Sequence, residues 1–517
     1  MHNNPYTQEN ARHGALHYLM GRGVAGVAGF LTVILLVRFM DVQNYAAYTA
    51  LSGLVALCGV LAGLGIERIV SRYVPEGRLY RTAEELAKFV WATSGIRFAA
   101  ALFIVLLLYV FWASVDDFLI VSEFKSFSIA LGSFIVAEVM FQHFSSVLQS
   151  LVMQKTLTRL LVIQWAGRLA MIAVFVYMNS VISWEEALWV FAIPEVIGVI
   201  GFVLVIHHHL HVLSNQVHSD IKEGSWPNWS KVTEVGLHNY GFTLLAAPPQ
   251  GYFMKLLTSA YLPVEVVAAY GFFVSIAEKA RQYIPLHFFY GLLEPMMIAS
   301  YLKDRDFVSL SQRCQLLYKS NLLLMVPAIA WVAVAGDSIV AVMTGGKFQG
   351  LSWILLLVMT QLTIGSHIVL LQLILNSLEK SKLLIVASMV ALPVMLLAMA
   401  LAVSISPIFL LGAPILFSLT MNLYIVFQLA VAEHPYEPSW KMIGGVSLSG
   451  FAAFAVLELL GWAITLESTR LAAAALTLVG TVTVYGVMIW LSKTIGKAEI
   501  EFIKNIIFNI RRAKAGA

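Results

Sequence analysis

The chain has 517 residues, of which 59% are hydrophobic and only 12% are charged, and its mean hydropathy is +0.81. Soluble domains carry about twice that share of charge, so the composition excludes an ordinary soluble protein and indicates a polytopic membrane protein. The formal net charge of +4 is modest and argues against nucleic acid as a partner. With Cys58 and Cys314 as the only cysteines, neither a structural disulfide nor a thiolate metal site is expected, and we expect no cofactor.

Apolar segments long enough to cross a membrane follow one another along the whole chain. A spanning helix needs about 20 apolar residues, and on that rule we expect about fourteen transmembrane helices in an all-α protein. They lie near 14–37, 45–66, 89–112, 126–149, 158–178, 187–206, 236–258, 263–297, 315–335, 350–377, 383–403, 406–430, 442–463 and 470–491. The eighth is too long for one straight helix, and we expect a bend near Pro285.

A short internal repeat relates the start of the chain to its middle. The matched residues are Leu16, His17, Val42, Ala46, Ala47 and Tyr48 in the first copy, and Leu237, His238, Val264, Ala268, Ala269 and Tyr270 in the second. The offset is 221 residues at the first match and 222 at the later ones. A self-match at about half the chain length predicts two similar lobes, as in many transporters. In the second copy, Pro248 and Pro249 interrupt an apolar span and should break its helix.

Lysine and arginine gather in alternate connections between the spans, beginning with the connection that holds Arg68, Arg72, Arg78, Arg81 and Lys88. By the positive-inside rule, both termini are expected in the cytoplasm. The connection at 207–235 is the longest. No clustered cysteine or carboxylate partner accompanies its His207, His208, His209 and His211, so we interpret it as a solvated linker rather than a metal site. The tail at 492–517 alternates isoleucine with lysine and arginine, which predicts either an amphipathic stretch on the anionic cytoplasmic leaflet or a dispensable end.

Signatures of enzymes and nucleotide-driven pumps are absent from the sequence. It contains no G-x-x-x-x-G-K-[ST] loop, no G-x-S-x-G elbow and no H-E-x-x-H helix. Its expected outer loops are also too short to fold as a catalytic domain. We therefore expect no enzyme and no direct use of ATP by this chain.

Charged residues inside the expected spans carry most of the functional information. The cations that we expect to bind substrate are Arg22, Arg97, Arg168, Lys255 and Arg281. Charge at such depth usually faces a bundle interior or a hydrated cavity, and arginine suits phosphate because its planar fork binds two oxygens at once. The pattern predicts a cationic cavity for a phosphate-bearing substrate. The alternative is internal pairing, for example of Arg168 with Glu138 or Glu195, and of Glu278 with Arg281.

The intramembrane acids have two interpretations that the sequence leaves open. Glu138, Glu195 and Glu278 either hold a cation in a salt bridge or take up a coupling ion, which would be a proton or sodium. His143 and His367 are either satisfied core histidines or members of a proton relay.

Two stretches carry a resemblance to a known family. They are RFMDVQNYAAYTALSGLVALCGVLAGLGIERIVSRYVPE, which starts at Arg38, and GDSIVAVMTGGKFQGLSWILLLVMTQ, which starts at Gly336. Both resemble recurring patterns of the polysaccharide-biosynthesis (Wzx-type) flippases, whose superfamily also holds drug/cation antiporters and the peptidoglycan-precursor flippase. The resemblance implies a transporter in the bacterial inner membrane that moves undecaprenyl-pyrophosphate-linked sugar repeat units to the outer leaflet, alongside a polysaccharide polymerase and export machinery.

The resemblance also implies a division of the chain. Six spans each would form two lobes, followed by two extra helices and the tail: 1–206, linker 207–235, 236–430, 431–491 and 492–517. Three other functions stay open. They are a cation-coupled multidrug antiporter of the same superfamily, an integral-membrane polysaccharide polymerase or ligase, and a structural partner in an export complex.

Overall fold

The structure is a computed structural model. It describes residues 8–119, 127–214, 226–288, 305–464 and 470–492, together with the single residues 290, 297, 298, 301 and 494. Side chains are described from residue 21 onward within these ranges, except those of residues 22 and 461–470. This part of the chain is helical almost throughout and has no strand, so the expected all-α fold is confirmed. It divides into two compact units, Met1–Lys279 with Leu401–Leu410, and Ala280–Ala400 with Leu411–Ala517.

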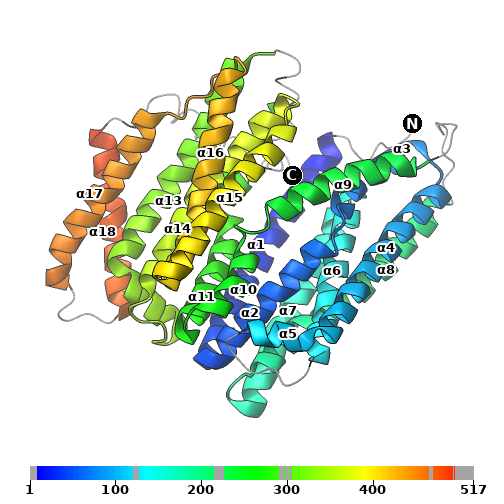
Figure 1. The fold of residues 1–517 in the computed structure, drawn as a ribbon, viewed down its shortest axis with the longest axis horizontal. Coiled ribbons are helices and arrows are strands. Elements are labelled where there is room, and N and C mark those ends of the chain that lie inside the picture. The colour runs from blue at the N-terminus through cyan, green and yellow to red at the C-terminus, as the bar shows by residue number, and fades with distance from the viewer. Residues whose placement is uncertain are drawn as a thin grey trace. The chain divides into compact units, whose positions relative to one another are not determined.

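The helices can be followed by their labels in Figure 1. The first unit holds α1 (Gln8–Phe39), α2 (Val42–Leu61), α3 (Ile66–Tyr80), α4 (Ala83–Val110), α5 (Trp112–Phe118), α6 (Ile129–Ser150), α7 (Gln154–Asn179), α8 (Trp184–Ser214), α9 (Trp229–Leu245), α10 (Gly251–Tyr261) and most of α11 (Val264–Arg281). The boundary between the units falls within α11, after Lys279. The later helices are α13 (Phe307–Thr344), α14 (Ser352–Ser377), α15 (Lys382–Ile405), a 3-10 helix (Pro407–Gly412), α16 (Ala413–Val431), α17 (Trp440–Ile464) and α18 (Arg470–Leu491).

Eleven helices in the described ranges are long and apolar enough to cross a membrane. The other three expected spans correspond to α1, whose apolar part is Gly23–Phe39, to the pair α9 and α10, and to α11. The α9–α10 span is divided by a turn at residues 246–250, where the predicted break at Pro248 and Pro249 falls. Four charged residues interrupt the apolar character of α11, and this helix ends at Arg281 in a turn just before Pro285.

The connections contain more helix than the sequence suggested. The segment expected as a linker at 207–235 is helical at both ends, because α8 continues to Ser214 and α9 begins at Trp229. The side chain of Asn228 caps α9 by accepting from the Lys231 backbone amide at 3.3 Å. Leu210 and Leu213 are buried in the core, which explains why α8 does not stop at the histidines. The tail expected to be amphipathic lies outside the described residues, apart from its first few positions.

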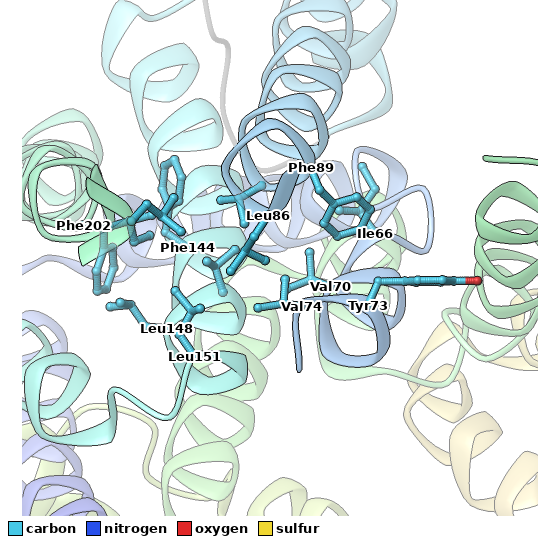
Figure 2. Packing of buried hydrophobic residues seen from close by; sticks show 14 of the residues in the cluster. Ile66, Val70, Tyr73, Val74, Leu86, Phe89, Phe144, Leu148, Leu151 and Phe202 are labelled. Atoms are coloured by element: carbon cyan, nitrogen blue, oxygen red, sulfur yellow. The ribbon is translucent and has the colours of Figure 1, made fainter. Parts of the chain in front are cut away.

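A second helix missed by the sequence is α3, in the basic connection after α2. Its residues alternate with helical period between an apolar face and a polar face. The apolar face packs against α4, α6 and α9, and Ile66, Val70 and Val74 join a buried cluster with Leu86, Phe89, Phe144, Leu148, Leu151 and Phe202 (Figure 2). Arg68 and Arg72 lie on the exposed face. Burial of this apolar face holds α3 on the unit, although α3 is not apolar enough to count as a membrane span.

The internal repeat corresponds to two helices that pack on each other. Val42 is the first residue of α2 and Val264 is the first residue of α11. The same offset of 222 residues relates Thr49 to Gly271, and a Cβ atom on Gly271 would lie 2.1 Å from the Thr49 hydroxyl oxygen. Contact between residues that are equivalent in two copies is what a local two-fold axis would produce. Glycine at 271 is therefore required by the close approach of α2 and α11.

The second unit is organised around α13, which packs against α14, α17 and α18, while α14 also packs against α16 (Figure 1). The Trp331 indole donates to the Ala474 carbonyl at 3.0 Å and fixes α13 against α18. The boundary between the compact units falls after Lys279, inside the eighth expected span, and the expected division into two six-span lobes stays a prediction. One reason is that α10 packs closely along α2, where a Cβ atom on Gly53 would lie 2.7 Å from the Tyr252 carbonyl oxygen.

Candidate functional site

The centre of the first unit holds a buried ion pair between two neighbouring helices. Arg168 on α7 donates to Glu195 Oε1 on α8, and the two residues are only 5% and 0% exposed. The residues that precede them explain the close approach, because a Cβ atom on Gly167 would lie 3.3 Å from the Pro194 ring. The structure thus pairs Arg168 with Glu195, one of the two acids that the sequence offered as partners.

Aromatic rings enclose the guanidinium group of Arg168. Its Cζ lies 4.1 Å from the centroid of Trp165 and 4.6 Å from that of Phe191, within the range of cation–π interactions. Trp165 comes three residues before Arg168 on the same face of α7. Its indole ring lies against α1 at Gly29, where a Cβ atom would be 3.1 Å away. The rings shield the guanidinium from water and leave few directions from which an anion can reach it.

A second acid lies beside this ion pair. Glu138 on α6 is half-buried, and its Oε1 accepts from the side-chain amide of Gln142, one turn later, at 2.7 Å. Glu138 also interacts electrostatically with Glu195. Glu195 Oε2 and Arg168 Nε have no hydrogen-bond partner within the described part of the chain. The pair is therefore close-packed but not fully satisfied.

Helices α10 and α11 add two lysines and an acid. Lys279 Nζ lies 4.7 Å from the centroid of Trp165, and this lysine interacts electrostatically with Arg168, Glu138, Glu278 and Lys255. Lys255 is 7% exposed and donates to the Ser275 hydroxyl at 3.1 Å. We call Glu138, Arg168, Glu195, Lys255, Glu278 and Lys279 the central charge cluster. It holds as many acids as bases, so its cations already have internal counterions.

The other expected substrate residues lie elsewhere or outside the described side chains. Arg97 on α4 is 1% exposed and forms an ion pair with Glu67 of α3 at 2.9 Å, so it belongs to a second polar group. In that group His143 bonds the Ser94 hydroxyl at 2.8 Å. Arg281 is exposed at the end of α11 and belongs to the second compact unit. Arg22 lies on α1, and its side chain is not among those described.

Sequence reasoning did not include several residues that shape the cluster. Trp165 and Phe191 were not predicted, although the spacing of Trp165 and Arg168 on one helix face could have indicated the first. The Tyr48 hydroxyl interacts electrostatically with Arg168, Glu195, Glu138 and Glu278, and this residue was noted only as part of the repeat. Glu67 gave no signal, because its partner lies 30 residues away on another helix.

The sequence and the fold were then compared with known proteins. A family described as "Polysaccharide biosynthesis protein" matches residues 11–285, more than half of the chain. No curated protein matches the sequence. The fold is similar to that of the lipid II flippase MurJ in an inward closed conformation, with a TM-score of 0.65 and 12% identity over 91% of this chain and 97% of that one.

Multidrug transporters share the same fold. An inward-facing MATE family transporter of the MOP superfamily aligns with a TM-score of 0.55 and 10% identity over 81% of this chain and 98% of the other. A mutant of the Vibrio cholerae MATE transporter VcmN aligns with a TM-score of 0.50 and 15% identity over 82% of this chain and 97% of the other. These identities are too low to carry a function, but they establish the architecture. The family match and the helical fold together show that this chain is a multi-pass membrane protein that belongs to the polysaccharide biosynthesis protein family.

Proposed function

We propose that the protein is a transporter that moves undecaprenyl-pyrophosphate-linked oligosaccharide repeat units from the cytoplasmic to the outer leaflet by alternating access. The observation that carries this proposal is the state of Arg168, which is buried between two aromatic rings with one carboxylate as its counterion. A diphosphate offers more acceptor oxygens than Glu195 and matches the planar guanidinium fork. Family membership gives the polysaccharide connection, and MurJ, which shares the fold, is itself a lipid flippase.

The central charge cluster would bind the diphosphate by replacing Glu195 with the diphosphate as the partner of Arg168. Lys279 lies beside the same indole ring as Arg168, so the two cations repel each other unless an anion is shared between them. Lys255, on α10, interacts electrostatically with Lys279 and adds a third positive charge to the region around Arg168. A bound diphosphate would relieve this repulsion and would compete with Glu195 for Arg168. Arg97, Arg281 and Arg22 would assist at other stages of passage as further cations in contact with the diphosphate.

The proposed cellular setting is a bacterial inner membrane with both termini in the cytoplasm. Family membership supports the membrane, and the positive connections on one side of the expected spans support the orientation. The substrate head group would cross while its lipid tail stays in the bilayer, and a polymerase and export machinery would consume the product. A proton or sodium gradient would supply the driving force, and the protein itself would catalyse no covalent reaction.

A second candidate is export of cationic drugs, which the three glutamates of the cluster favour on charge alone. Glu195, however, is held by Arg168, and Glu278 and Glu138 interact with Lys279. A cationic ligand would have to displace these internal cations from their acids. Loss of the gene would then raise drug susceptibility and leave lipid-linked sugars unchanged.

The test uses a deletion strain and membrane vesicles of both orientations. Lipid-linked repeat units would be oxidised with a membrane-impermeant reagent in right-side-out and inverted vesicles. We expect them to accumulate where only inverted vesicles react, and the wild-type gene should restore their appearance on the outer face. Arg168→Ala should fail to restore it, whereas Lys88→Ala, which removes an exposed cation, should restore it fully. Accumulation on the outer face, or normal levels, would rule out a flippase.

A further inference from the structure

A second buried cation, Arg97 on α4, keeps hydrogen-bond donors that the described part of the chain leaves unused. Arg97 is 1% exposed, and its Nη2 donates to Glu67 Oε1 of α3 at 2.9 Å. Its Nε and Nη1 have no partner among the described residues. A guanidinium carries five N–H donors in a planar fork and can bind two oxygens of a phosphate group at once. The bond to one carboxylate oxygen therefore leaves most of this fork available to a larger anion.

The polar group around Arg97 extends to α6. Ser94 precedes Arg97 by three residues on the same face of α4, and its hydroxyl bonds His143 Nε2 at 2.8 Å. His143 is fully buried, and its Nδ1 also lacks a partner within the ranges that the structure describes. We call Glu67, Ser94, Arg97 and His143 the Arg97 site. Its single acid is Glu67, so the hold of Glu67 on Arg97 decides whether the site can take another anion.

The exposure of Glu67 distinguishes it from Glu195, the counterion of Arg168. The side chain of Glu67 is 54% exposed, whereas that of Glu195 is 0% exposed. A half-exposed carboxylate regains water when it leaves its cation, so its ion pair contributes little, whereas a buried carboxylate would be stranded. Displacement of Glu67 from Arg97 therefore costs far less than displacement of Glu195 from Arg168. An incoming anion should exchange with Glu67 first.

Helix α6 connects the Arg97 site to the central charge cluster. It carries both His143 and Glu138, which are five residues apart and therefore about 7.5 Å apart along the helix axis. His143 is the nearer of the two to the end of α6 that packs against α3, where Leu148 and Leu151 share a buried cluster with Val70 (Figure 2). A ligand that enters from the side of α3 would therefore meet the Arg97 site before the central charge cluster.

We propose that Arg97 is the first binding site for the diphosphate of the substrate, and that Glu67 is an internal competitor which occupies Arg97 until the diphosphate replaces it. This proposal rests on the proposed function, because it requires a diphosphate substrate. The diphosphate bonds Nε, Nη1 and Nη2 of Arg97 while Glu67 turns to water. When the diphosphate moves on to Arg168, Glu67 pairs with Arg97 again. This exchange keeps the affinity of the first site low enough for onward passage.

The first experiment follows Glu67 in the full-length wild-type protein in detergent. A water-soluble carbodiimide and an amine label accessible carboxyl groups, and mass spectrometry of the peptides measures the labelling rate of each acid. A short-chain isoprenyl diphosphate disaccharide should raise the rate at Glu67 about fivefold, because the bond to Arg97 is lost. Glu84 is the matched control, because it is the exposed acid of the Lys88 pair and should not respond.

The phosphate of a membrane phospholipid offers similar chemistry, so short-chain phosphatidylglycerol is titrated in parallel. It carries one negative charge and one phosphate group, too few oxygens to replace Glu67 and also fill the rest of the fork. We expect it to change the labelling of Glu67 less than twofold. An equal response to phosphatidylglycerol would assign the site to membrane lipids and overturn the proposal.

A second experiment measures affinity by calorimetric titration with the same disaccharide. The variant Arg168→Ala with Glu195→Gln removes the ion pair of the central charge cluster, so its remaining affinity belongs to Arg97. Glu67→Gln added to this variant should raise the affinity about fivefold, and Arg97→Gln should abolish binding. Glu84→Gln should change nothing. Structural damage lowers affinity, so a rise in affinity identifies the loss of a competitor.

The outcomes separate this proposal from the proposed function. Wild-type binding with unchanged or reduced labelling of Glu67 would overturn the internal competitor and leave the flippase proposal intact. So would Glu67→Gln that binds no more tightly, or no binding after loss of the central ion pair. Failure of the wild type to bind the disaccharide would overturn both proposals. If the combined variants do not fold, the labelling of wild-type Glu67 still decides the question.

Discussion

The two compact units each bury a polar group among helices, and the two groups differ in how completely they are satisfied. In the second unit, His367 on α14 contacts Asn422 Oδ1 through Nδ1 at 3.1 Å and the Tyr436 hydroxyl through Nε2 at 3.2 Å. Asn422 also donates to the Ile364 carbonyl. Both ring nitrogens of His367 therefore have hydrogen-bond partners, and His367 is a satisfied core histidine.

The central charge cluster of the first unit is built differently. Its members are acids and bases, and one oxygen of Glu195 and one nitrogen of Arg168 have no partner among the described residues. A network of neutral groups with every bond made stabilises one packing, whereas an incompletely satisfied charged network can exchange partners with a ligand. The comparison teaches that burial of polar groups alone does not identify a site. What distinguishes the central charge cluster from the histidine group is buried charge with bonds left to make, a property that Arg97 shares through its Nε and Nη1.

The largest effect should come from Arg168. Arg168→Ala should abolish polymer export and, by leaving Glu195 buried without a cation, should destabilise the protein by about 3–5 kcal/mol. The double variant Arg168→Ala with Glu195→Gln removes that stranded charge and should recover thermal stability while export stays absent. Thermal unfolding in detergent and polymer yield measure the two effects. Normal export by the double variant would make Arg168 a structural residue like His367.

Packing between the repeated helices should come next. Gly271→Leu would force a side chain into Thr49 and should cost about 1–3 kcal/mol, with reduced export because Tyr48 and Lys279 lie on the same two helices. The exchange Thr49→Gly with Gly271→Thr places the larger residue on the other copy and should recover most of the stability. Thermal unfolding and export report on both variants. Equal damage in the exchanged variant would argue against a local two-fold relation.

His367 tests the other side of the comparison. His367→Phe would leave Asn422 and Tyr436 without their buried partner and should destabilise the protein by about 1–3 kcal/mol. Ligand affinity of the folded variant should match that of the wild type, measured with the isoprenyl diphosphate disaccharide at a temperature well below unfolding. A folded His367→Phe variant that no longer binds ligand would show that the histidine group takes part in recognition.

The smallest effect on stability should come from ion pairs in which at least one side chain is exposed to solvent. Glu67→Gln leaves Arg97 buried without its acid, but Glu67 itself is 54% exposed, so water can replace it and the cost should be about 1 kcal/mol. Glu84→Gln removes the acid of the exposed Lys88 pair and is the matched control, with no change expected in the melting temperature. A large effect of Glu67→Gln on ligand affinity would extend the functional region from the central cluster to α3.

Much of the fold could be predicted because the membrane imposes strong rules on sequence. The expected spans have helical counterparts, and the proline pair at 248 and 249 coincides with a turn, because proline cannot donate a helical hydrogen bond. The helix α3 escaped prediction because it is amphipathic and lies in a basic connection. Its stability comes from burial against α4, α6 and α9, which no local pattern reveals.

The sequence by itself determined the membrane class, the family and the presence of charge inside the spans, since each depends on composition and local order. Only the tertiary structure decided which charges meet. The sequence offered Glu138 and Glu195 as equal partners for Arg168, and the close packing of Gly167 on Pro194 brings Glu195 to it. Contacts between residues on different helices depend on crossing geometry and on single small residues, and these are properties of the packed molecule.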